Sequence, residues 1–199
     1  MSVRVASTLV GSIAAGTEFA GAVRAGAVVF MIALTAVAAQ ISFPIPGTAV
    51  PFTLQPMAAI LAGAALGSRL GAASQMGYLM LGIMGLPVFA VAPLLPQGAA
   101  RLLGPTGGYL MAYPIAAFVT GLLAERGFDR RFSTSVIAML AGLSIIYAGG
   151  LSWLSAMHLG SVTLAVAAGA APFFVADLFK AVVAAAALPQ VWKLLGPRG

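Results

Sequence analysis

Long apolar runs separated by short polar breaks fill most of the chain, and six of them have the length of a membrane helix or approach it. They lie at about 24–42, 54–68, 70–90, 107–124, 133–155 and 171–193. A helix needs about 20 apolar residues to cross the hydrocarbon core, so the second run is short for a span. The runs are continuous and lack the alternation that membrane barrel strands require. The pattern predicts an all-α integral membrane protein with six transmembrane helices.

Composition supports this class and excludes several functions. Of the 199 residues, 61% are hydrophobic and 7% are charged, whereas a soluble domain carries about 25% charged residues. The absence of cysteine excludes disulfides and thiolate metal sites, and the single histidine cannot build a metal site alone. No nucleophile–histidine–acid set is available either. We therefore expect no enzyme activity, no metal and no cofactor.

The basic residues are dispersed along the chain at the ends of the apolar runs, so the net charge of +6 does not indicate nucleic-acid binding. With the N-terminus in the cytoplasm, eight of the ten would lie on the side where Lys and Arg collect. These eight are Arg4, Arg24, Arg69, Arg126, Arg130, Arg131, Lys193 and Arg198. Both termini are then cytoplasmic, and loops 43–53 and 91–106 are external.

The N-terminal segment 1–23 stands apart from the six runs. It begins like a weak signal peptide, but Glu18 interrupts it and it is rich in small polar residues. We expect residues 1–23 to form a cytoplasmic or interfacial segment and residues 24–195 to form one membrane domain.

The first external loop, FPIPGTAVPFT, is apolar and contains Pro44, Pro46 and Pro51. Proline fixes φ and removes a donor, so this loop is stiff and cannot be helical throughout. A stiff apolar loop outside the membrane indicates a lid that covers a cavity. A simple connector between two helices is the alternative.

Asp177 and Lys180 interrupt the last apolar run, APFFVADLFKAVVAAAALP. A charge at membrane depth costs at least about 2.5–3.5 kcal/mol, so such residues are usually functional. Three residues apart, they share one helix face. They either meet a small polar solute that has a donor-rich end and an anionic end, or neutralise each other so that the helix can insert.

Other polar side chains within the runs fit a pocket near this pair. Gln75 and Tyr78 are three apart on the third run, and Tyr109 and Tyr113 are four apart on the fourth. Under the topology above, Tyr109, Tyr113 and the Asp–Lys pair lie in the external half of the membrane. We expect a polar pocket there, roofed by the two external loops.

Glycines at 63, 67 and 71 are spaced four apart, which allows helices to approach closely in lipid. They favour packing inside the bundle, and a docking face for another membrane subunit is the alternative.

Three strings in this order, GLPVF, PTGGYL and DLFK, resemble the BioY family, and the similarity spans roughly residues 30–195. These proteins are the biotin-specific substrate-binding components (S components) of energy-coupling factor (ECF) transporters. The resemblance implies a six-helix S-component bundle in the cytoplasmic membrane of a bacterium or archaeon. It implies biotin captured from outside, and a transmembrane coupling subunit with ABC-type ATPases as separate chains. A solitary gradient-driven transporter, an S component for another vitamin, and a membrane enzyme or scaffold are the alternatives.

The resemblance also implies roles for individual residues. In DLFK, Asp177 would bind the ureido ring of biotin and Lys180 its valerate carboxylate. Arg101 could reach the same carboxylate. Gln75, Tyr78 and Tyr113 are the further candidates around the bicyclic ring, and the loop 43–53 would be the lid.

Overall fold

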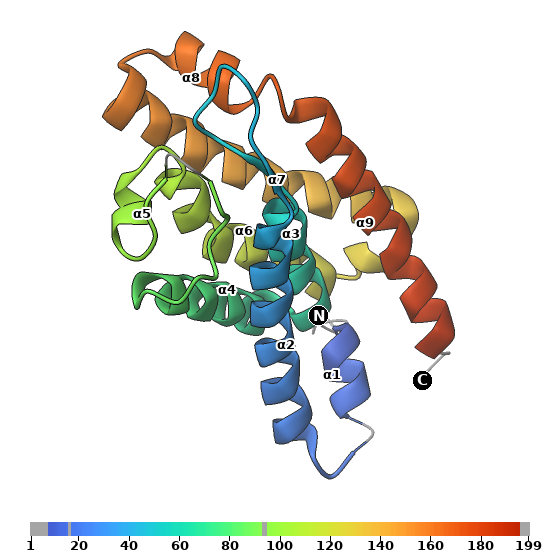
Figure 1. Cartoon of the computed structure of the whole chain (residues 1–199). Helices are drawn as coiled ribbons and strands as arrows, with labels where there is room; N and C mark the ends of the chain where they lie inside the picture. Colours follow the sequence, from blue (N-terminus) through green and yellow to red (C-terminus); the bar gives the residue numbers. More distant parts are fainter. Residues whose placement is uncertain (1–7, 16, 93–94, 196–199) are drawn as a thin grey trace.

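The computed structural model describes residues 8–15, 17–92 and 95–195 and is mainly helical (Figure 1). The α-helices are α1 (Leu9–Ala14), α2 (Ala20–Gln40), α3 (Gln55–Leu66), α4 (Ser68–Ile83), α5 (Ala100–Leu103), α6 (Gly107–Glu125), α7 (Phe132–Leu154), α8 (Val162–Gly169) and α9 (Phe174–Leu195). A 3-10 turn, η1 (Phe128–Arg130), joins α6 to α7, and a π-helical turn, η2 (Ser155–Leu159), extends α7. Two short strands, β1 (Ser42–Phe43) and β2 (Phe52–Thr53), lie between α2 and α3.

Every apolar run of the sequence contains a helix, but the helices differ in length. Among the described residues, α2, α6, α7 with η2, and α9 are long and apolar enough to cross a membrane. The α3 helix has 12 residues and α4 has 16, below the ~20 residues of a full span. The predicted all-helical membrane class is therefore confirmed, whereas length and composition support four of the six predicted spans.

Gly67 separates α3 from α4, and α4 ends at Ile83, before the end of the predicted run 70–90. The Gly67 φ of 89° lies in the left-handed region, where glycine alone is unstrained. A Cβ on Gly71 of α4 would lie 2.6 Å from the Gly63 Cα of α3, and one on Gly63 would lie 2.1 Å from the Ala117 carbonyl oxygen of α6. Gly63 and Gly71 thus allow close packing within the bundle, as predicted.

The α6 helix lies at the centre of the fold, against α3, α4 and α7. The α9 helix packs along α7, and α2 packs against α3 and α4. Residues 9–14 form α1, which contacts α2 and α3. Residues 1–7 and 16 of the predicted N-terminal segment lie outside the described residues, and α2 begins at Ala20, inside the segment's predicted bounds.

The loop 43–53 leaves α2 and returns to α3 as an antiparallel hairpin, the long blue excursion between these two helices in Figure 1. Ser42 pairs with Thr53, and Phe43 pairs with Phe52. We call residues 42–53 the hairpin. Because β2 leads directly into α3, the hairpin places Thr53 beside the first turn of α3 and over the interior of the bundle.

Candidate functional site

A cavity of about 60 Å³ lies between the end of the hairpin and helices α3, α6, α7 and α9. A buried water needs about 10–15 Å³ on this measure, so the space holds a few water molecules. Its walls combine apolar side chains with polar groups from segments that are far apart in the sequence. The polar lining consists of Thr53, Gln55, Arg101, Thr106, Tyr109, Tyr113, Tyr147 and Asp177.

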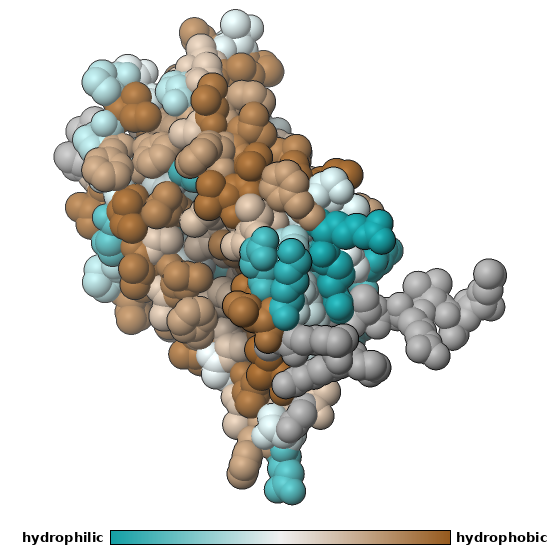
Figure 2. All heavy atoms as spheres, turned by 90° about the vertical axis from the view of Figure 1, so that its right-hand side faces the viewer, coloured by the Kyte–Doolittle hydropathy of each residue, from teal (hydrophilic) through white to brown (hydrophobic). Residues whose placement is uncertain are grey.

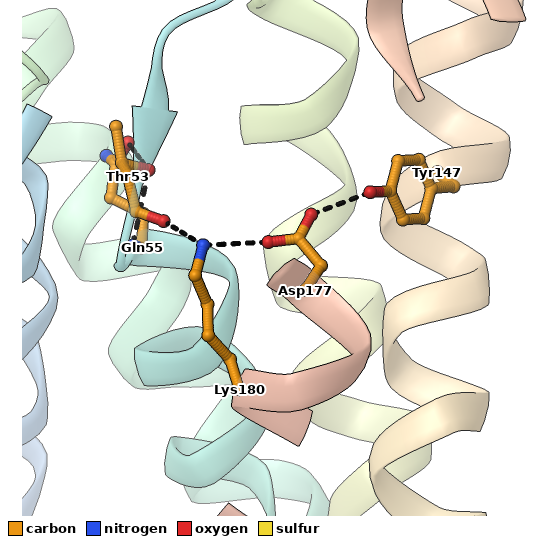
Figure 3. Close-up of polar contacts among 5 residues, drawn as sticks. All are labelled: Thr53, Gln55, Tyr147, Asp177 and Lys180. Atoms are coloured by element: carbon orange, nitrogen blue, oxygen red, sulfur yellow. Dashed lines mark hydrogen bonds and ion pairs between the residues drawn. The ribbon is translucent and has the colours of Figure 1, made fainter. Parts of the chain in front are cut away.

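Asp177 and Lys180 form a buried ion pair at the start of α9 (Figure 3). Lys180 Nζ lies 2.8 Å from Asp177 Oδ1, and each residue is 8% exposed. The other carboxylate oxygen, Oδ2, accepts a 2.7 Å hydrogen bond from the Tyr147 hydroxyl of α7. The pair meets because residues three apart share a helix face, and the helix N-terminus further favours the carboxylate.

Lys180 also contacts the hairpin. Its Nζ donates a 2.7 Å hydrogen bond to the Thr53 carbonyl oxygen and lies 3.5 Å from the centroid of the Phe52 ring. A cation over an aromatic face is attracted by the ring quadrupole. The ammonium of Lys180 therefore joins α9 to β2, the strand that leads into α3.

Arg101 lines the same cavity and is 2% exposed. Its Nη1 donates to the Pro96 carbonyl oxygen at 3.2 Å, and Nη2 donates to the Ala90 carbonyl oxygen. No acidic side chain among the described residues forms an ion pair with it. Asp177 and Arg101 line the cavity, and Lys180, which does not line it, is bonded to the lining residues Asp177 and Thr53. Together these three buried groups leave one positive charge without an ionic partner in the described part of the chain.

The tyrosines divide into two groups. Tyr113, a predicted site residue, lines the cavity with Tyr109 and Tyr147. Tyr109 also donates a 2.9 Å hydrogen bond to the Gly169 carbonyl oxygen. Tyr78, another predicted site residue, does not line the cavity; its hydroxyl donates to the Val88 carbonyl oxygen at 3.1 Å and accepts from the Gln55 amide.

Gln75 lies in a different interface. Its side chain is fully buried, and Nε2 donates to Thr35 Oγ1 of α2 at 3.1 Å. The amide that lines the cavity is Gln55, at the start of α3, within 3.3 Å of Thr53 Oγ1. Gln55 and Thr53 line the cavity but were not among the predicted site residues. Their positions in the sequence could have indicated them, because both polar side chains follow the last proline of the hairpin and precede an apolar run.

Comparisons with known proteins agree over most of the chain. The family described as BioY matches residues 9–197. A protein of Thermotoga maritima named "Biotin transporter BioY" is 42% identical over 162 residues, which cover 81% of this chain and 91% of that protein. A protein of Pyrococcus horikoshii named "Probable biotin transporter BioY" is 45% identical over 157 residues, covering 79% of this chain and 88% of that protein.

A solved structure shares the fold as well. It is the crystal structure of the S-component for biotin from an ECF-type ABC transporter, which matches with a TM-score of 0.79 and 27% identity. The match covers 89% of this chain and 94% of the other.

Proposed function

This chain belongs to the BioY family, and we propose that it is the biotin-binding substrate-capture component of an ECF-type transporter. The family is one of transporter components, which agrees with the prediction that the chain is not an enzyme. The observation that carries the proposal is a cavity lined by Asp177, whose buried ion-pair partner is Lys180, and by Arg101, which has no ionic partner among the described residues.

The charges of this cavity fit a ligand with one carboxylate and a set of N–H donors. Asp177 presents a carboxylate that accepts charge-assisted hydrogen bonds, as the ureido N–H groups of biotin require. Lys180 and Arg101 are the cations for the valerate carboxylate. A single negative charge on the ligand would balance the one positive charge that the cavity carries in excess, so that every buried ion gains a partner.

The remaining candidates take positions around these charges. Tyr113 and Gln55 line the cavity and serve the bicyclic ring through contact and hydrogen bonding. Tyr78 acts indirectly, because its hydroxyl holds the Gln55 amide. Gln75 lies farther from the cavity and acts by holding α4 against α2 through its hydrogen bond to Thr35.

The hairpin is the lid in this proposal. The present cavity of about 60 Å³ is far smaller than the ~300–1,000 Å³ of ordinary ligand pockets. Thr53 and Val50 of the hairpin line it, and Phe52 covers Lys180. Entry of a bicyclic ligand therefore requires the hairpin to move away from α9.

We further propose six transmembrane helices, with α3 and α4 as the shorter two, and both termini in the cytoplasm. Burial by neighbouring helices supports this for α3, because most of its residues face protein. The membrane would be the cytoplasmic membrane of a bacterium or archaeon. A transmembrane coupling subunit and ABC-type ATPases on separate chains would supply the energy.

Equilibrium binding of radiolabelled biotin to the detergent-purified chain tests the proposal, with other vitamins as competitors. We expect stoichiometric binding that only biotin analogues displace. A folded protein that fails to bind biotin, or that releases it equally to unrelated vitamins, would remove the biotin assignment.

A further inference from the structure

Four exposed cations gather at the end of the bundle opposite the cavity. They are Arg69, Arg126, Arg131 and Lys193, and we call them the basic rim. Lys193 lies 16 residues after Asp177 on α9, or about 24 Å along the helix at 1.5 Å per residue. Figure 2 shows hydrophilic side chains grouped on a face that is otherwise largely hydrophobic.

Two sets of contacts bring the basic rim together from four segments. Glu125 Oε1 at the end of α6 accepts from Ser68 N and Oγ, both at 2.8 Å, which places Arg126 beside Arg69 at the start of α4. At the end of α9, Trp192 Nε1 donates to Asp129 Oδ2 at 2.5 Å. That bond joins the end of α9, which carries Lys193, to the turn that leads into Arg131.

The acidic residues of these segments are already engaged. Glu125 is held by Ser68, while Asp129 is 1% exposed and lies 3.6 Å from Arg130 Nε. No ion pair joins either acid to a member of the basic rim among the described residues. The rim therefore presents four positive charges outward.

We propose that the basic rim binds the phosphate groups of anionic phospholipids at this surface of the membrane. The cations stand at the ends of apolar helices, where Lys and Arg reach the headgroup layer and anionic lipids attract them. They are spread around a rim on four segments, which fits a layer of headgroups better than one compact acidic partner. Trp192, half-buried beside them under the Arg130 guanidinium, is a residue type enriched at this depth.

Helix geometry supplies a second reason. Arg131 is the N-cap residue of α7, which has no side-chain cap, whereas the N-terminus of α4 beside Arg69 already holds the Glu125 carboxylate. A cation at a helix N-terminus opposes the macrodipole, and a phosphate placed there satisfies both the dipole and the arginine.

The test compares spin-labelled phosphatidylglycerol with spin-labelled phosphatidylcholine in vesicles that contain the full chain. Electron spin resonance gives the relative association constant of the two lipids from the fraction with restricted motion. The variants are Arg126→Gln and Arg131→Gln, and the matched controls are Arg126→Lys and Arg131→Lys, which keep the positive charge at the same exposed positions. Circular dichroism and size-exclusion chromatography check that each variant folds.

We expect the wild-type chain and the two lysine variants to prefer phosphatidylglycerol to the same extent, and each glutamine variant to lose preference by up to about fivefold, the effect of one cation near an anionic surface. Added salt should reduce the preference in all of these proteins. An unchanged preference in both folded glutamine variants would overturn the proposal and leave an acidic protein partner as the occupant. An equal loss in the lysine variants would also overturn it, because loss of the positive charge would then not be the cause.

Discussion

Replacing Lys180 by Met tests whether the Lys180 ammonium pairs with the ligand carboxylate, because it removes the charge while nearly preserving the side-chain volume. The ammonium of Lys180 lies 2.8 Å from Asp177 Oδ1 and 2.7 Å from the Thr53 carbonyl oxygen, at 8% exposure. The substitution leaves Asp177 with the Tyr147 hydroxyl as its remaining side-chain donor. Breaking a buried pair in this way costs about 3–5 kcal/mol, because the surviving charge stays buried without its counter-ion.

The effect on binding depends on the charge of the ligand. The Lys180 ammonium can make a charge-assisted hydrogen bond of about 1.5–3 kcal/mol to either ligand, but only the carboxylate adds the attraction of an opposite charge. We therefore expect Lys180→Met to weaken biotin binding by at least about 13–160-fold and binding of its primary amide by a smaller factor. The assay is competition against radiolabelled biotin. Lys193→Met, an exposed lysine on the same helix, is the control and should leave both affinities unchanged.

Equal losses for biotin and its amide would refute the pairing of Lys180 with the carboxylate and leave Arg101 to carry that role. Loss of folding is a separate outcome that the double variant Asp177→Asn/Lys180→Met detects. Because it removes both charges, it should recover part of the stability that the single variant loses. A double variant as unstable as the sum of the two singles would show that the ion pair does not couple them.

Three further predictions concern stability, measured by unfolding with SDS in mixed micelles. Tyr147→Phe removes a hydrogen-bond donor to the Asp177 carboxylate and should cost about 1.5–3 kcal/mol of stability. Tyr109→Phe should cost less, because the Tyr109 hydroxyl donates to a neutral carbonyl. Equal costs would contradict a charge-assisted bond at Asp177. Gly121→Ala would place a Cβ 2.4 Å from the Gly67 and Ser68 backbone and should cost about 1–3 kcal/mol, whereas Gly26→Ala meets nothing within 4 Å and should be neutral or stabilising. Burial raises the pKa of Asp129 above its usual value of 3.8, so the folded state binds a proton on this carboxylate more readily than the unfolded state does. The free energy of unfolding should therefore rise as pH falls from 7 toward 4. Asp129→Asn should abolish this rise.

The sequence predicted the helical segments and the Asp–Lys pair because both follow from local rules. Continuous apolar runs require helices in lipid, since the backbone must satisfy its own hydrogen bonds. A spacing of three positions on one helix brings Asp177 and Lys180 together, independently of the rest of the fold. The division between the second and third runs was predicted within two residues of Gly67, but the end of α4 at Ile83 was not, because hydropathy continues to about residue 90.

The rotation of α4 about its own axis could not be predicted. Gln75 and Tyr78 are three residues apart, which corresponds to about 60° around a helix and about 4.5 Å along it. That offset is enough for Gln75 to meet Thr35 of α2 while Tyr78 meets Gln55 of α3. The amide that lines the cavity therefore came from a different helix, since the direction of a helix face depends on its tertiary neighbours.

The contact of Lys180 with the hairpin links ligand charge to closure in the proposed function. When the hairpin moves outward, Lys180 loses the Thr53 carbonyl and the Phe52 ring but keeps Asp177 on its own helix. In the proposed function, a ligand carboxylate would then bind this ammonium and the Arg101 guanidinium. Closure over a mono-anion buries a set of charges that sums to zero, whereas closure over a neutral analogue again buries one cation without an ionic partner. The same two cations would thus favour the anionic ligand and make the closed hairpin most stable when that ligand is present.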